Sequence, residues 1–112
     1  MEILKVSGKS VPKSVAGAIA QVLRRDEYVL LQAVGPDAVN QAVKSIAIAR
    51  CYLVEDSLDL AAYPTFEKID IEGLVRTAIK FELERRPIRD PSLPRAEGLS
   101  TPSRIPHGVE RE

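Results

Sequence analysis

The sequence has few of the residues that build catalytic and metal sites. Its 112 residues include one cysteine, Cys51, one histidine, His107, and no tryptophan. Zinc sites need several cysteine or histidine ligands, so we expect no metal. Cys51 has no histidine close in sequence to act as a base, and we interpret it as structural rather than nucleophilic. We therefore expect no enzyme activity, no cofactor and no small-molecule substrate.

Long apolar runs and a net charge are also missing. No run approaches the ~20 apolar residues that a membrane-spanning helix needs, and the first residues lack the pattern of a secretory signal. A lone cysteine cannot form an internal disulfide, which favours a reducing interior. We therefore expect a cytoplasmic protein with no membrane partner. The segment "SGKS" at 7–10 lacks the upstream glycine of a phosphate-binding loop, which excludes a nucleoside-triphosphate site of that type.

Sixteen basic residues balance sixteen acidic ones, whereas nucleic-acid-binding proteins usually have a basic excess. The charges are unevenly distributed, however. Residues 1–54 carry seven basic and four acidic side chains, and residues 55–86 carry five basic and eight acidic ones. Such an asymmetry can give one positive face or help two copies associate. Three of the acidic residues, at 55, 56 and 59, are interpreted as a solvated turn rather than as a catalytic pair.

The hydrophobic pattern predicts six elements in the order β-α-β-α-β-β. The first two strands should be parallel with a right-handed crossover, and the last two should form a hairpin with its turn at Glu72-Gly73. Both helices should cover one face of a four-stranded mixed sheet, which makes a two-layer α/β sandwich. The expected elements are a strand at 2–6, a helix at 13–25, a strand at 27–35, a helix that opens at 35–37, and strands at 58–71 and 74–86.

Several local features refine this prediction. In the second helix, Val39, Val43 and Ile46 form an apolar stripe. Gly17 inside the first helix suggests close packing against the sheet, and Pro64 indicates an edge strand or a bulge. Residues 1–86 should form the folded domain, since the proline-rich composition of 87–112 is typical of a disordered tail.

A polar rim is the best candidate for a binding site. Lys9 and Lys13 follow the first strand, and Asn40, Gln41 and Lys44 lie in the first turns of the second helix. Parallel strands end at the same edge of a sheet, where helix N-termini also point and favour anions. We expect these five residues to gather on one positive edge that suits a phosphate backbone, although many polar rims bind nothing.

Three segments resemble the stage V sporulation protein S family: "MEILKVSGKSVPKSVAGAIAQVLR", "LQAVGPDAVNQAVKSIAIAR" and "RTAIKFELE". The resemblance covers residues 1–86 and departs at "RRDEY". That family is similar in fold to Alba, a dimeric archaeal chromatin protein that binds DNA and RNA. The resemblance implies a nucleic-acid partner, DNA or RNA, for a regulator of sporulation or development. It places phosphate contacts at the same five rim residues.

The resemblance also implies hairpin contacts, here through Lys68 and Arg76, although three acidic residues lie in the same hairpin. Ile48 lies about one turn beyond Lys44 on the second helix and Cys51 is close to the same line, so both are candidates for a homodimer interface. Burial of these two side chains within the chain explains them equally well. The alternative function is a protein-interaction or scaffold module in sporulation or development that does not bind nucleic acid directly.

Overall fold

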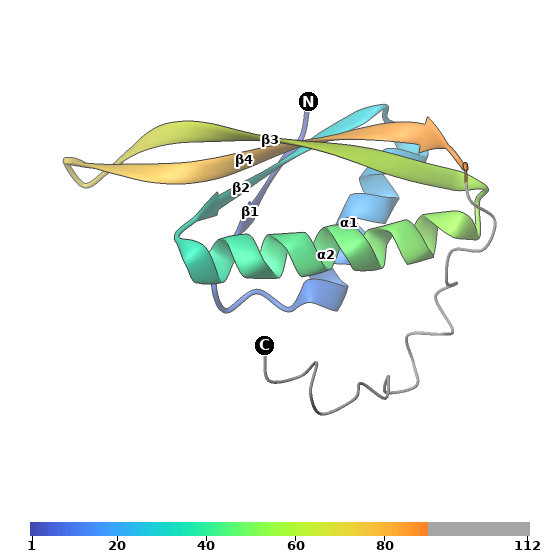
Figure 1. The fold of residues 1–112 in the computed structure, drawn as a ribbon, viewed down its shortest axis with the longest axis horizontal. Coiled ribbons are helices and arrows are strands. Elements are labelled where there is room, and N and C mark those ends of the chain that lie inside the picture. Colours follow the sequence, from blue (N-terminus) through green and yellow to red (C-terminus); the bar gives the residue numbers. More distant parts are fainter. Residues whose placement is uncertain (90–112) are drawn as a thin grey trace.

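One sheet of four strands is covered on one face by two helices, and the other face is open (Figure 1). The computed structural model describes residues 1–89, so most of the predicted tail, including His107, lies outside the described residues. The β-α-β-α-β-β order and the two-layer architecture are confirmed. The elements are β1 (Ile3–Val6), α1 (Pro12–Arg25), β2 (Tyr28–Val34), α2 (Pro36–Val54), β3 (Leu58–Ile71) and β4 (Leu74–Pro87).

The strands lie in the order β1-β2-β4-β3. β1 pairs in parallel with β2, from Ile3 opposite Leu30 to Val6 opposite Ala33. β2 pairs with β4 in antiparallel orientation, and β3 forms the predicted hairpin with β4. β3 is therefore an edge strand, where Pro64 removes no hydrogen bond from the interior of the sheet.

The core lies between the sheet and the helices, but α2 buries a different face from the predicted one. Val43 is 51% exposed, and Val39 and Ile46 are only half-buried. Val39 and Ile46 pack against the core cluster, but the fully buried positions lie one residue earlier along the helix. Four of the six buried positions are alanine or serine, and such small side chains let the backbone of α2 approach its neighbours closely. The buried residues of α2 are Ala38, Ala42, Ser45, Ala49, Leu53 and Val54.

The interpretation of Gly17 is also wrong. A Cβ atom built at this position meets nothing within 4 Å, so close packing does not require glycine there. The glycine therefore lowers helix propensity without a compensating contact in the described chain.

The β3–β4 hairpin projects beyond the rest of the sheet (Figure 1). β2 pairs with β4 only over residues 78–84, so the outer part is a two-stranded ribbon. Its turn has positive φ angles at Glu72 (51°) and Gly73 (82°), which confirms the predicted turn and matches a two-residue hairpin loop. The ribbon leaves Phe66 79% and Val75 68% exposed.

Within residues 1–89, neither helix is long and apolar enough to cross a membrane.

Candidate nucleic-acid interface

The loop after β1 and the start of α2 meet at one edge of the sheet. A hollow at this edge is lined by residues 7–9 from the loop and by residues 34–38 from the end of β2 and the start of α2. A Cβ atom at Gly8 would lie 2.9 Å from the Cβ atom of Asp37, so only glycine permits this approach. Gly35, with φ of 89°, redirects the chain into α2. The predicted meeting of the two segments is therefore present.

A hydrogen bond fastens the two segments together. Nε2 of the half-buried Gln41 donates to the carbonyl oxygen of Ser10 at 3.0 Å. Ser10 lies between Lys9 and Lys13 in the sequence, and Gln41 lies between Asn40 and Lys44. The bond therefore holds the two polar segments side by side. A hydrogen bond of this kind contributes on the order of 1 kcal/mol to the free energy of unfolding.

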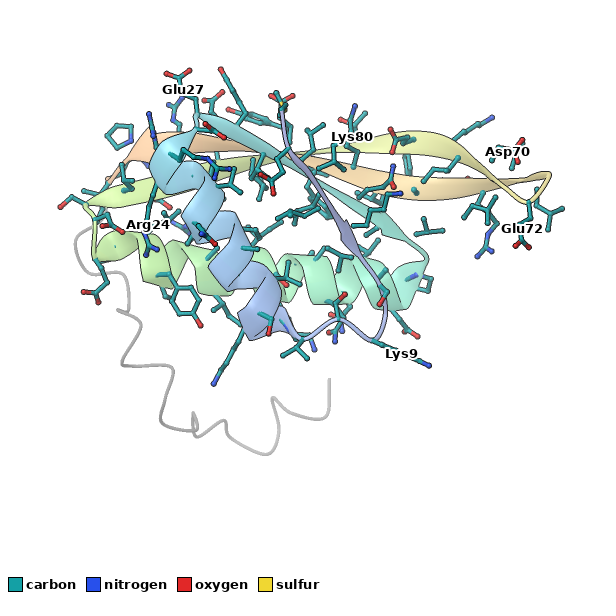
Figure 2. The ribbon with its side chains drawn as sticks, turned by 180° about the vertical axis from the view of Figure 1, so that it is seen from behind. Lys9, Arg24, Glu27, Asp70, Glu72 and Lys80 are labelled. Carbon is teal, nitrogen blue, oxygen red and sulfur yellow. The ribbon has the colours of Figure 1, made fainter. Side chains whose placement is uncertain are left out.

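The loop is also held by bonds within itself. The amide of Ser7 donates to Oγ of Ser10 at 2.9 Å, and the amide of Ser10 donates to the carbonyl of Ser7 at 3.1 Å. The amide of Lys9 donates to Oγ of Ser7 at 3.1 Å. These bonds fix the backbone that carries Lys9, whose side chain extends away from the body of the protein (Figure 2).

Three of the predicted side chains are lysines on the two segments that meet here, and Lys9 lines the hollow. Lys9, Lys13 and Lys44 are exposed, and none of them is in an ion pair within residues 1–89. Asn40 is exposed as well. Gln41 differs, because it is half-buried and its amide nitrogen donates to the loop. From here on, the rim denotes Lys9, Lys13, Asn40, Gln41 and Lys44.

One carboxylate accompanies these lysines. Asp37 lies in the first turn of α2, where its charge offsets the positive end of the helix dipole. The first turn of α1 has no acidic residue, so its N-terminus is the more favourable one for an anion. Lys9 and Asp37 both line the hollow, so one positive and one negative side chain meet there.

The two hairpin residues that are candidates for nucleic-acid contacts do not lie together in the structure. Lys68 lies opposite Thr77, whereas Arg76 lies opposite Ile69. Because side chains alternate along a strand, Lys68 and Arg76 are on opposite faces of the ribbon. The tip between them is acidic (Figure 2): it carries Asp70, whose Oδ1 accepts a bond from the amide of Gly73 at 2.9 Å, and Glu72.

The two candidates for a dimer interface are both half-buried within the chain. Ile48 packs against the core cluster, and the Cys51 thiol donates to the carbonyl oxygen of Ala47 at 3.6 Å. Burial raises the pKa of the Cys51 thiol, and the charge of Arg50 and a backbone hydrogen bond oppose this only in part. The thiol is therefore protonated at neutral pH, as a structural cysteine should be. Dimerisation through this surface stays a prediction.

The interpretation of the three carboxylates after α2 is correct for two of them only. Glu55 and Asp56 are exposed, and Asp56 accepts a bond from Nε of Arg24 at 2.6 Å. Asp59 is 4% exposed and forms a two-bond ion pair with Arg50, so it is not part of a solvated turn. Within residues 1–89, no group of three or more His, Cys, Asp or Glu side chains could hold a metal ion.

Comparison with known proteins agrees with the fold. The family model described as stage V sporulation protein S matches residues 2–86. The chain belongs to the stage V sporulation protein S family. Alba from Thermoplasma volcanium is similar in structure, with a TM-score of 0.52 and 19% sequence identity, over 74% of this chain and 96% of that chain. At this identity the likeness shows the fold alone, and it confirms the Alba-like architecture of this sporulation protein S domain.

Sequence reasoning did not include Gly8, Ser10 or Asp37 in the site, although they affect how the loop and the start of α2 are held together. Gly8 and Asp37 had visible signals, since a glycine in a short loop and an acidic residue after Gly35-Pro36 are typical of tight turns and helix starts. The Ser10 carbonyl had none, because a backbone acceptor leaves no trace in the sequence.

Proposed function

We propose that this member of the sporulation protein S family is a small regulatory protein that binds DNA or RNA through the rim. Lys9, Lys13 and Lys44 contact backbone phosphates, and the Asn40 amide adds a hydrogen bond. The observation that carries the proposal is the bond from Gln41 to Ser10, which keeps the lysine-bearing segments adjacent. Family membership supports the role in sporulation, and the Alba-like fold supports the nucleic-acid partner.

The binding depends on backbone phosphates rather than on base edges. The rim carries lysines and amides, and it has no arginine or aromatic side chain that would read or stack on bases. Because phosphate contacts release counterions, the affinity falls with salt by a logarithmic slope of about 0.9 for each contact on duplex DNA.

The test is a fluorescence anisotropy titration of duplex DNA and of RNA at several salt concentrations. We expect Lys9→Glu plus Lys13→Glu to weaken binding and to reduce the salt slope by about two. Lys5→Glu is the control, because it reverses one charge at an exposed position of β1 outside the rim. Undetectable binding at low salt, or equal losses for Lys9→Glu and Lys5→Glu, would refute the proposal.

The apolar surface of the hairpin favours a second candidate, a protein-interaction or scaffold module. Phe66, Leu74 and Val75 are each at least 67% exposed, and the chain has no net charge. In this case, partners should remain bound to the full chain after nuclease treatment of a lysate. They should be lost from a Phe66→Ser plus Leu74→Ser variant, while the rim variant keeps them.

A further inference from the structure

A second hollow, with a volume of about 470 Å³, lies beside β3, the outer strand on the far side of the sheet from β1. It is formed by β3, by the end of β4 and the residues after it, and by the second half of α2. Ala61 and Ala62 of β3 line it, and their small side chains leave its space open. A volume of several hundred Å³ is typical of pockets for small ligands.

Three arginines from different parts of the chain line this hollow. Arg50 comes from α2, Arg86 from β4, and Arg89 follows β4. The guanidinium of Arg50 donates through Nε (2.8 Å) and Nη2 (3.0 Å) to the two carboxylate oxygens of Asp59. The Asp59 side chain is only 6% exposed, so this pair forms a fixed wall of the hollow.

The other two arginines retain capacity for an anion. Arg86 donates through Nη1 to Oε1 of Glu84 at 2.8 Å, and a guanidinium has five N–H donors in total. Within residues 1–89, Arg89 is in no ion pair. The three arginines carry three positive charges, and the carboxylates of Asp59 and Glu84 carry two negative ones. One positive charge is therefore in excess at the hollow.

Arg89 and Asp59 both line the hollow, and the charge of Arg89 acts on the Asp59 carboxyl. Burial acts to raise the pKa of Asp59, but hydrogen bonds from Arg50 and from the amide of Leu60 act against it. The charges of Arg50 and Arg89 also lower this pKa, and the net result lies below the usual 3.8. The positive field of Arg89 therefore reaches the interior of the hollow.

An aromatic ring lies in the same hollow. Tyr63 of β3 is 48% exposed and lines the same space, on the same face of β3 as Asp59 and Ala61. A phosphate alone fills only a small part of 470 Å³. The remaining space offers a half-exposed ring, which suits a flat ring on the ligand because bases stack on aromatic side chains.

We propose that this hollow binds a nucleoside 5′-monophosphate, with Arg86 and Arg89 on the phosphate and Tyr63 against the base. Arginine binds phosphate through paired N–H groups, and this chemistry is the same for a free mononucleotide and for the 5′-phosphorylated end of a strand. The site is separate from the rim. Ile46 and Lys44 are two positions apart on α2, about 200° around the helix axis, so they face opposite sides.

The experiment is calorimetric titration of the full chain with AMP, adenosine and inorganic phosphate. We expect AMP to bind at least tenfold more tightly than either fragment. Arg86→Ala plus Arg89→Ala should weaken AMP binding at least tenfold, and Tyr63→Ala should weaken AMP binding while leaving phosphate binding unchanged. Arg76→Ala, which removes an exposed arginine from β4 outside the hollow, is the matched control.

Trinucleotides with and without a 5′-phosphate distinguish the two sources of the ligand. Binding of the phosphorylated trinucleotide but not of AMP would assign the hollow to strand ends, and AMP binding would assign it to the free nucleotide. The proposal is overturned if neither phosphorylated ligand binds at millimolar concentration, if adenosine binds as tightly as AMP, or if Arg76→Ala weakens binding equally. The rim variant Lys9→Glu plus Lys13→Glu should keep AMP binding, so failure here is distinct from failure of the proposed function.

Discussion

Gly8 is the residue on which the geometry of the rim depends most directly. Any side chain there would collide with the Cβ atom of Asp37, which belongs to a helix and cannot turn aside as the end of a long side chain would. The loop would have to move away from α2, and this movement would stretch the bond from Gln41 to Ser10.

We expect Gly8→Ala to lower the free energy of unfolding by about 1–2 kcal/mol, because overpacking forces the backbone to shift. Gly17→Ala is the matched control. A Cβ atom at Gly17 meets nothing within 4 Å, so alanine should stabilise the helix by about 0.5–1 kcal/mol. Urea denaturation of both variants measures the two effects, and a loss of stability in both would contradict this account.

Asp59 should make stability depend on pH. Its pKa lies below 3.8 despite its burial, so the folded chain favours the ionised carboxylate. A lowered pKa gives stability that is present above about pH 4 and is lost as the pH falls through the folded-state value. Asp59→Asn removes the ion pair with Arg50 and should cost about 2 kcal/mol at pH 7.

Urea denaturation at a series of pH values tests this expectation. The difference in unfolding free energy between the natural chain and Asp59→Asn should be constant from pH 5 to pH 7 and should shrink below pH 4. A difference that persists unchanged at pH 3 would show that the ion pair is not its source.

At the scale of elements, the hairpin combines two environments in one pair of strands. Near β2 it belongs to a four-stranded sheet that is covered by helices, and Leu83 is fully buried there. Beyond Ala78 it is a ribbon of two strands without a third neighbour. Isolated two-stranded hairpins are marginally stable in water.

We therefore expect amide hydrogen exchange to divide the hairpin. Amides of residues 68–77 should exchange at least tenfold faster than those of residues 79–83, because local opening of the ribbon exposes no core. Mass spectrometry with short peptic peptides resolves the two segments. Equal protection along β4 would mean that another surface covers the ribbon in solution.

The elements themselves could be predicted from the sequence, because periodicity and turn residues determine them locally. The turn at Glu72-Gly73 and the edge position of Pro64 followed from backbone chemistry alone. The buried face of α2 did not follow, since alanines that permit close packing carry a weaker hydrophobic signal than Val43 on the exposed side.

Parallel strands predicted where the rim segments would meet, but the bond from Gln41 to Ser10 depends on tertiary distances. The hollow beside Arg50 was missed for the same reason.

At the scale of the whole molecule, the exposed part of α2 determines how two copies would associate. We expect a homodimer that uses the surface of α2 around Ile48 and Cys51. Cys51→Glu places a charge on this surface and should shift the chain toward the monomer in sedimentation velocity. Gln21→Glu is the control, because it adds the same charge at an exposed position of α1. A natural chain that sediments as a monomer at all concentrations would refute the dimer, and an equal shift in both variants would refute the assigned surface.

The strand order has a consequence for how the chain reaches its native state. β4 is the last strand in the sequence, yet it lies between β2 and β3. Val34 must therefore find Ala78, and Tyr28 must find Glu84, across more than forty intervening residues. Such distant pairings slow the search, because the entropy of closing a long loop is lost before the contact is gained. We therefore expect the helices to form early and the insertion of β4 between β2 and β3 to limit the folding rate.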